Sequence, residues 1–377
     1  MHVTLASSLL GGLSPAQFMR RHWQKKPLLV RQAWPGVRPP LTRSALFALA
    51  QQPDVESRLV VAQGDGDWRV RQGPLPRHAL PPLARPGWTL LLQGLDLHVE
   101  AARAMLAPFR FVPEARLDDL MLSWASDGGG VGPHVDAYDV FLLQVAGRRR
   151  WRVGRVADAS FVDGLPLKIL RHFEPEFDCL LEPGDMLYLP PLWGHDGRAE
   201  GECMTCSVGF RAPRANELAC DLLQRLADDD GEDDPGRLYR DAAQAATATP
   251  GLISPALQDF ARQAIVRRLA DVSAIDRALG ESLSEPKPHV WFEAAEGKTL
   301  AHGVQLDRRS RMLYDSRHVF FNGEAYVVAG RDARLVRLLA DARQLDAHAC
   351  AALSAGASDV LQGWLDAGWL HPAEEIA

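Results

Sequence analysis

The chain has 377 residues, of which 47% are hydrophobic and 24% are charged. This length and composition exclude a disordered tail and suit two or three folded domains. The formal net charge of -6 argues against a surface built to bind nucleic acid, because such surfaces usually carry a basic face.

The cysteine content and the N-terminal residues favour a reducing cytoplasm. The five cysteines are too few and too scattered for a disulfide framework; they are Cys179, Cys203, Cys206, Cys220 and Cys350. The apolar pair Leu9 and Leu10 has no preceding Lys or Arg and is soon broken by two glycines and a proline, unlike a signal peptide. No stretch approaches the roughly 20 apolar residues of a membrane span. We therefore expect a cytoplasmic protein without a membrane segment.

Residues 1–211 show the pattern of a strand-rich domain that opens with a helix. Ser14 can cap this helix, Pro15 suits the first helical position, and Gln17 stands where a capping box needs it. Short apolar runs bounded by Gly and Pro follow, and their length and spacing favour a β-barrel or β-sandwich. These predicted strands are Thr89–Leu92, Leu120–Ala125, Val140–Val145, Arg150–Val153 and Met186–Leu189.

From about residue 214 the sequence becomes helical. Apolar residues recur at intervals of three and four in two segments, which contain Leu218, Leu222, Leu223 and Leu226, and Leu257, Phe260, Ala261, Ala264 and Ile265. The apolar faces of two such helices can form a dimer seam. Between them, Asp228–Asp234 is strongly acidic and is predicted to be a solvated loop, with docking of a basic partner as the alternative.

The C-terminal part of the chain contains a strong hairpin signal. Two β-type runs between Val319 and Val328 flank the pair Asn322-Gly323, which favours a tight turn. A helix follows, carrying Leu335, Leu338 and Leu339. A hairpin beside helices resembles a winged helix, but the acidic balance of the chain disfavours a DNA-binding regulator, which would show salt-dependent DNA binding.

The central motif is Gly132-Pro-His-Val-Asp136, followed much later in the sequence by His195. Residues two apart on a strand face the same side, so His134 and Asp136 can bind one ion. His195 from a distant strand would complete the two-His, one-carboxylate arrangement of non-haem Fe(II) oxygenases, which leaves positions open for a cosubstrate and O2. The alternatives are a hydrogen-bonded His134 at a strand edge and a His195 in a surface loop.

Strand alternation selects one arginine as a cosubstrate ligand. The segment Gly147-Arg-Arg-Arg-Trp-Arg-Val153 has four arginines, and the apolar Trp151 and Val153 should point inward, which carries Arg149 inward too. An inward guanidinium needs an anion, and the distal carboxylate of 2-oxoglutarate is a natural bidentate partner. The alternative is a buried ion pair with a protein carboxylate. The other three arginines are expected on a solvated or substrate-facing surface.

Several segments resemble a known family. Leu181–His195 looks like the second cupin motif of JmjC-type 2-oxoglutarate oxygenases. Four further stretches are similar to the bacterial ribosomal oxygenases within that family, namely Phe18–Leu29, Met121–Phe141, Gly147–Gly154 and Ser207–Pro213. The resemblance spans nearly the whole chain and implies an α+β protein in three parts. These are a double-stranded β-helix (cupin or jelly-roll) oxygenase domain over residues 1–211, a helical dimerisation segment over 212–280, and a winged-helix-like domain over 281–377.

This resemblance also implies an activity. Members hydroxylate the β-carbon of an arginine in a large-subunit (50S) ribosomal protein, using Fe(II), 2-oxoglutarate and O2 and releasing succinate and CO2. By resemblance His134, Asp136 and His195 are the metal ligands, Arg149 binds 2-oxoglutarate, and Ser123 is a further cosubstrate contact. Ser123 can equally be an ordinary strand hydroxyl. A homodimer is expected, with no direct DNA binding.

Some residues and alternative activities stay open at this point. An arginine substrate needs anions near the pocket, and Asp127 and Asp139 are candidates, although either can equally cap a turn near the glycine run. Cys203 and Cys206 would face opposite sides of a strand, so they are expected to be core cysteines rather than a metal site. The same iron chemistry could act on a histidine or a small molecule. A noncatalytic metal-binding cupin is a further alternative, which the inward Arg149 disfavours.

Overall fold

The computed structural model describes residues 2–64, 66–228, 237–294 and 297–373. The chain divides into two compact units, Met1–Ala212 and Pro213–Ala377. Among the described residues, no helix combines the length and the apolar character needed to cross a membrane.

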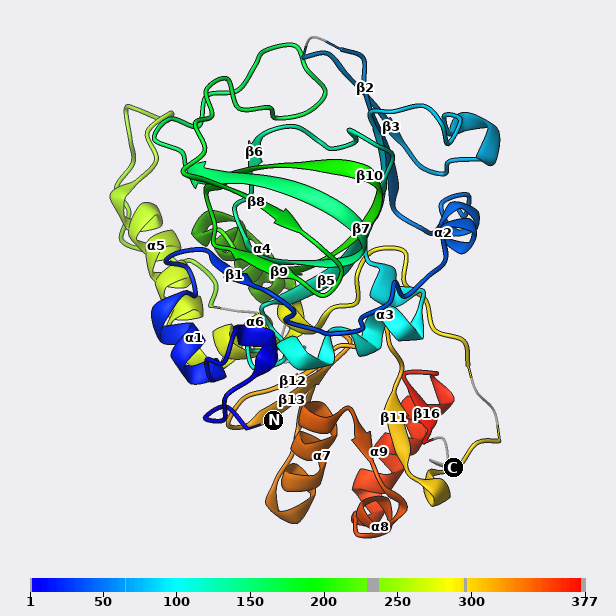
Figure 1. The fold of residues 1–377 in the computed structure, drawn as a ribbon. Coiled ribbons are helices and arrows are strands. Elements are labelled where there is room, and N and C mark those ends of the chain that lie inside the picture. The colour runs from blue at the N-terminus through cyan, green and yellow to red at the C-terminus, as the bar shows by residue number, and fades with distance from the viewer. Residues whose placement is uncertain (1, 65, 229–236, 295–296, 374–377) are drawn as a thin grey trace. The chain divides into compact units, whose positions relative to one another are not determined.

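The first unit is built on a ten-stranded antiparallel sheet. Its main path runs in the order β1-β9-β7-β10-β5-β4-β2-β3, while β6 pairs with β10 and β8 with β7. The strands are β1 (Leu28–Val30), β2 (Ser57–Ala62), β3 (Trp68–Gln72), β4 (Trp88–Leu92), β5 (Leu117–Ala125), β6 (His134–Val135), β7 (Asp139–Arg155), β8 (Phe177–Leu181), β9 (Met186–Leu189) and β10 (Trp193–Phe210). Figure 1 shows β7 and β10 as long, curved neighbours that cross the unit. The predicted strand-rich domain is confirmed.

One correction concerns β7. Val140–Val145 and Arg150–Val153 were predicted as two strands, but they are parts of one 17-residue strand. Gly147 bends the strand without ending it, because its φ of 60° is easily adopted by glycine. Residues on both sides of the bend pair with β10, so the ladder continues past it.

The helices of the first unit are short and mostly support the sheet. They are η1 (Ser8–Leu10), α1 (Pro15–Arg21), α2 (Arg43–Leu49), η2 (Arg77–Ala79), η3 (Leu95–Leu97), α3 (Glu100–Ala104) and η4 (Ala107–Phe109). The predicted capping box is confirmed, since the Gln17 amide donates to Ser14 Oγ at 3.2 Å and the Ser14 amide donates to Gln17 Oε1 at 2.9 Å. Phe18 of α1 is fully buried against Phe141 and Tyr188 of the sheet. This packing fixes α1 to strands β7 and β9.

Gly147→Ala is expected to lower the free energy of unfolding by roughly 3 kcal/mol or more. A Cβ here would come within 2.1 Å of the Glu202 carbonyl oxygen and 2.8 Å of Cys203 Cα, in addition to the left-handed φ. Gly164→Ala is the matched control, because Gly164 has a φ of 79° but no atom of the described residues within 4 Å of its Cβ position. The control should lose only about 1–2 kcal/mol. Chemical denaturation measures both, and equal losses would contradict the steric argument.

The second unit combines helices with two three-stranded sheets, β15-β11-β16 and β12-β13-β14. Its elements are α4 (Ala215–Asp228), α5 (Pro255–Leu269), α6 (Val272–Ser284), η5 (Leu300–His302), β11 (Val304–Leu306), β12 (Met312–Tyr314), β13 (His318–Phe321), β14 (Glu324–Val327), α7 (Gly330–Ala342), β15 (Gln344–Leu345), α8 (Ala347–Ala351), α9 (Ala355–Asp366) and β16 (Leu370–Pro372). The predicted hairpin is confirmed, because Asn322 and Gly323 join β13 to β14 with φ values of 51° and 92°. The helix predicted after it is α7.

Helix α6 lies across the predicted boundary between residues 280 and 281. Gly280 packs so closely on the ring of Phe320 in β13 that a Cβ would come within 2.2 Å of it. Helix α6 therefore packs with the hairpin. The two predicted amphipathic helices are α4 and α5, and the acidic run after Asp228 lies outside the described residues.

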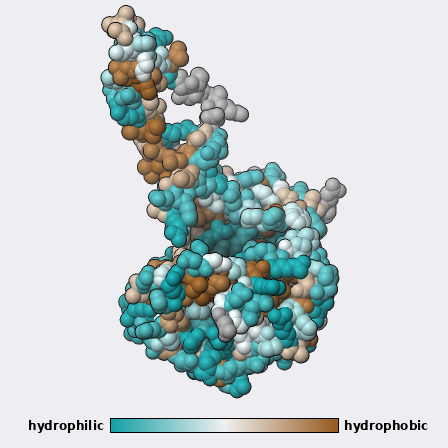
Figure 2. Space-filling model, turned by 90° about the horizontal axis from the view of Figure 1, so that it is seen from above, coloured by the Kyte–Doolittle hydropathy of each residue, from teal (hydrophilic) through white to brown (hydrophobic). Residues whose placement is uncertain are grey.

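Helix α5 leaves its apolar side chains at the surface of the unit. Leu257, Ile265 and Val266 are 41%, 61% and 67% exposed, and no residue of this helix is buried. Figure 2 shows hydrophobic side chains exposed at the surface of the molecule. A monomer seldom leaves such a surface uncovered.

Candidate active site

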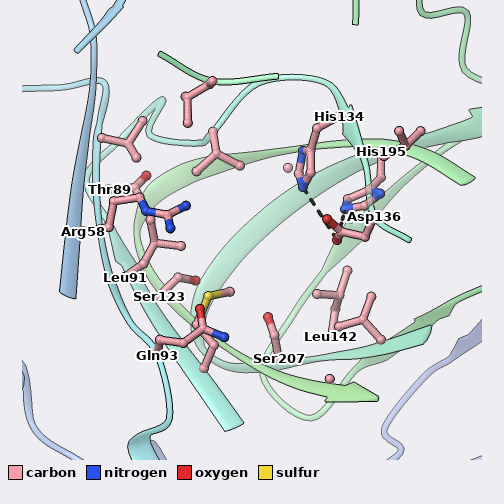
Figure 3. A pocket seen from close by; sticks show the side chains of 18 of the residues that line it. Arg58, Thr89, Leu91, Gln93, Ser123, His134, Asp136, Leu142, His195 and Ser207 are labelled. Carbon is pink, nitrogen blue, oxygen red and sulfur yellow. Dashed lines mark ion pairs between the residues drawn. The ribbon is translucent and has the colours of Figure 1, made fainter. Parts of the chain in front are cut away.

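His134, Asp136 and His195 come together on the inner side of the first unit (Figure 3). His134 lies on β6 and is the register partner of His195 on β10. Asp136 follows directly after the two-residue strand β6. Its Oδ2 lies 3.5 Å from His195 Nε2 and 3.9 Å from His134 Nε2. The three ligand atoms lie within 4.8 Å of one another, a spacing that one metal ion can bridge.

The backbone orients both imidazole rings. His134 Nδ1 lies 2.9 Å from the Gly132 carbonyl oxygen, and His195 Nδ1 lies 3.0 Å from the Trp193 carbonyl oxygen. A carbonyl oxygen only accepts, so each Nδ1 must donate its hydrogen. In the neutral ring this leaves the lone pair on Nε2, which faces Asp136. Such hydrogen bonds on the far side of the ring are the usual support of a metal-binding histidine.

The electrostatics of the three residues favour a cation between them. Burial lowers the pKa of His134, and the nearby His195 lowers it further. Burial alone would raise the pKa of Asp136, but the hydrogen bond and charge of His195 hold it below its usual range. Burial would lower the pKa of His195, yet its contact with Asp136 raises it. The site therefore contains an ionised carboxylate that needs a positive partner.

A cavity of about 440 Å³ adjoins the three residues. Its wall combines apolar side chains, including Met121, Leu142 and Ile169, with a small number of polar and charged groups. This composition is typical of a site that binds a small molecule and excludes water around it.

Arg149 enters this cavity from β7 as a buried cation. It is 5% exposed, and its Nη1 donates to Ser123 Oγ at 3.2 Å. Its Nε and Nη2 are buried and have no hydrogen-bond partner among the described residues. Burying a guanidinium without an anion costs several kcal/mol, roughly, so these atoms indicate an anionic ligand. The alternative of an ion pair with a protein carboxylate finds no support in the described part of the chain.

The alternation predicted for the arginine segment is confirmed. Arg148 and Arg150 are exposed on the opposite face of β7, while Trp151 and Val153 are buried with Arg149. Arg150 forms ion pairs with Asp178 at 2.7 Å and Glu200 at 2.6 Å. The charge of Arg150 is therefore already neutralised at the surface.

The two carboxylates suggested for the substrate lie elsewhere. Asp127 is exposed and accepts a hydrogen bond from the Gly201 amide at 2.8 Å, which is the turn-capping role. Asp139 is fully buried and accepts from the Tyr188 hydroxyl at 2.6 Å and from Gln24 Nε2 at 3.1 Å. Neither side chain lines the cavity. Asp127 and Asp139 therefore do not have the position that a contact with the substrate in this cavity needs.

Other charged residues that were not singled out do line the cavity, among them Asp118, Asp119 and Arg58. Alternation along β5 could have found Asp119, because it lies four residues before Ser123 and so shares its face. Arg58 could not be found in this way, since the pairing of β2 with β4 is not visible in the sequence. Cys203 and Cys206 belong to different hydrophobic clusters, as predicted for core cysteines.

The fold and the site define the chain as a JmjC-type 2-oxoglutarate-dependent dioxygenase, which uses Fe(II), 2-oxoglutarate and O2. Residues 104–218 match a JmjC domain and residues 267–371 match a ROXA-like winged helix. The chain belongs to the ribosomal oxygenase family. It is 38% identical over 275 residues to the ribosomal protein uL16 3-hydroxylase of Escherichia coli, covering 72% of this chain and 71% of that protein.

Further comparisons agree with this assignment. A probable ribosomal oxygenase of Haemophilus influenzae is 39% identical over 210 residues, which cover 55% of this chain and 52% of that protein. The X-ray structure of Escherichia coli YcfD superposes with a TM-score of 0.83 at 31% identity, covering 94% of this chain and 97% of that chain. A structure of YcfD in complex with cobalt and 2-oxoglutarate gives a TM-score of 0.79 at 30% identity, with coverages of 95% and 98%. The predicted family and α+β fold class are confirmed.

Proposed function

We propose that the chain hydroxylates the β-carbon of an arginine side chain in a large-subunit ribosomal protein, uL16 being the first candidate, and releases succinate and CO2. The observation that carries this proposal is the pair of Arg149 nitrogens that have no hydrogen-bond partner among the described residues. Arg149 lines the same cavity as His134, Asp136 and His195. The guanidinium of Arg149 suits the distal carboxylate of 2-oxoglutarate, and the three metal-binding residues suit its other end. The name of the similar Escherichia coli protein, a uL16 3-hydroxylase, supports the substrate.

Each group has a distinct task in this reaction. His134, Asp136 and His195 would hold the iron, which when bound supplies the oxidative chemistry with O2. Arg149 and Ser123 would hold the distal carboxylate of 2-oxoglutarate and so fix its orientation. The apolar wall around Met121, Leu142 and Ile169 excludes water from the reacting groups. The protein thereby orients one C–H bond of the substrate toward the oxidant.

The substrate guanidinium has a suitable place at the acidic end of the cavity. Asp119 and Ser123 lie four residues apart on β5, about 14 Å by strand geometry. Asp118 lines the acidic end as well, and its Oδ1 accepts from Arg211 Nε at 3.1 Å. Tyr138 also lines the cavity, and burial, followed by the charge of Asp136, raises the pKa of its hydroxyl, which therefore stays protonated. Two carboxylates and a phenol suit a guanidinium better than a neutral side chain.

The direct test uses purified protein, Fe(II), 2-oxoglutarate, O2 and ribosomal proteins, analysed by mass spectrometry beside His134→Ala. A mass gain of one oxygen on a single arginine, absent in the variant, is the expected result. Succinate formation without that gain would redirect the search to a histidine or a small molecule as substrate.

Asp118→Asn is expected to raise the KM for an arginine peptide on the order of 10-fold, because it removes one charge-assisted hydrogen bond to the guanidinium. The KM for 2-oxoglutarate should stay unchanged. Asp127→Asn is the matched control, since Asp127 does not line the cavity. Steady-state kinetics with each reactant varied in turn measure both constants. A peptide KM that changes equally in the two variants would contradict the placement of the guanidinium.

We also propose that the chain forms a homodimer and acts in the cytoplasm, where ribosomal proteins are made. The exposed Leu257, Ile265 and Val266 of α5 support a dimer seam, because paired helices would bury them. The molar mass in solution, measured by light scattering, tests the dimer, and a value near 41.5 kDa would exclude it.

A further inference from the structure

A second guanidinium enters the cavity from β2. Arg58 lines the cavity, and its Nε is buried without a hydrogen-bond partner among the described residues. No described carboxylate forms an ion pair with it, in contrast to Arg150 or Arg152, which pair with Asp178 and Asp196. Figure 3 shows Arg58 projecting from the wall that faces His134, Asp136 and His195. An unpaired cation at this position again indicates an anionic ligand.

The strand register places Arg58 level with Ser123. Arg58 pairs with Leu91 on β4, and Leu91 pairs with Ser123 on β5. Residues directly paired across a sheet share a face, and all three line the cavity. Two strand spacings separate Arg58 from Ser123, about 10 Å between Cα atoms, which an extended arginine side chain nearly spans. Arg58 can therefore reach the surroundings of Ser123, the residue that accepts from Arg149 Nη1.

Apart from Asp136 and Lys168, the Asp, Arg and Lys side chains that line the cavity are divided by sign along its length. Arg58, Ser123 and Arg149 lie at one end, and Asp118 and Asp119 lie at the other. A cationic substrate side chain is repelled from the first end and attracted to the second. The group that Arg58 binds is therefore an anion of the cosubstrate rather than a group of the arginine substrate.

We propose that Arg58 is a second binding residue for the distal carboxylate of 2-oxoglutarate, acting beside Arg149. A carboxylate has two oxygens and about four acceptor sites, so it can accept from two guanidiniums together. Two cations also favour a dicarboxylate over a 2-oxo acid that lacks the distal charge. This inference rests on the proposed role of Arg149 in binding 2-oxoglutarate.

The test is calorimetric binding to the full-length protein loaded with Zn(II), which allows binding without turnover. The ligands are 2-oxoglutarate and 2-oxobutyrate, which has no distal carboxylate. Arg58→Met should weaken the affinity for 2-oxoglutarate on the order of 10-fold and leave the affinity for 2-oxobutyrate unchanged. Arg58→Lys, which keeps the charge, should recover part of the loss. Arg58→Gln provides a second measure if the methionine variant does not fold.

Arg71→Met is the matched control for the loss of one positive charge. Arg71 is exposed on β3 and pairs with Leu59, so it lies on the face of the sheet opposite to Arg58. Its affinities should equal those of the unchanged protein. The inference would be overturned if Arg58→Met bound 2-oxoglutarate as tightly as the unchanged protein does. It would also be overturned if the variant lost affinity equally for both ligands. If the unchanged protein binds both ligands equally, or if Arg149→Met keeps the full preference for 2-oxoglutarate over 2-oxobutyrate, the proposed role of Arg149 fails instead.

Discussion

Replacing Asp136 with alanine is expected to lower arginine hydroxylation by on the order of 10³-fold or more. Removing a side chain that only hydrogen-bonds to a metal ligand typically lowers metal affinity or activity roughly 10–100-fold, and removing a ligand itself should lower them more. Asp136 is the one carboxylate of the triad, so its removal would leave a bound iron with no anionic ligand among the three residues. The two rings, whose centroids lie 4.2 Å apart, cannot replace that charge.

Mass spectrometry of the peptide product and the iron content of the purified variant measure this effect together. His302→Ala in the second unit is the control, because His302 is an exposed histidine outside the cavity. Its iron content and activity should match those of the unchanged protein. An Asp136→Ala protein that keeps activity within 10-fold, roughly, of the unchanged protein would contradict the proposed ligand set.

Arg149→Met is expected to separate cosubstrate binding from stability. The KM for 2-oxoglutarate should rise about 100-fold, because the variant loses a buried, charge-assisted contact worth roughly 2–5 kcal/mol. The melting temperature without ligand should not fall and should rise slightly, since an unpaired buried cation is replaced by an apolar side chain of similar length.

Thermal unfolding with and without 2-oxoglutarate measures both parts of this prediction. The unchanged protein should be stabilised by the ligand, and the variant should lose most of that gain. Arg148 lies one position before Arg149, on the opposite and exposed face of β7, so Arg148→Met should behave like the unchanged protein. A large drop in the melting temperature of ligand-free Arg149→Met would instead assign this residue a structural role.

The triad and Arg149 were accessible to prediction because each depends on local geometry. His134 and Asp136 are two residues apart, and the inward direction of Arg149 follows from the apolar neighbours Trp151 and Val153. The hairpin at Asn322-Gly323 was equally local. Predicting such features requires only the two-residue period of a strand or the residue preferences of a turn. It does not require knowing which strands become neighbours.

The remaining part of the site depends on pairing between distant strands. Arg58 reaches the cavity because β2 pairs with β4 and β4 with β5, although Arg58 and Ser123 are far apart in the sequence. Asp139 was misplaced for a similar reason, since the sequence does not reveal that Tyr188 of β9 and Gln24 cover its side of β7. The continuity of β7 through Gly147 was also not predicted, because a glycine within a strand pattern does not distinguish a bend from the end of a strand.

The unequal anchoring of the three metal-binding side chains bears on how iron enters and leaves. His195 belongs to an 18-residue strand that is paired with β7 and β6, whereas β6 has two residues and pairs with β10 alone. Opening the short segment that holds His134 and Asp136 breaks few backbone hydrogen bonds, and such sub-global openings need only part of the free energy of global unfolding. Two of the three side chains can thus swing away while His195 stays in place. We therefore expect that a bound metal would exchange in the folded molecule, without melting of the sheet that carries His195.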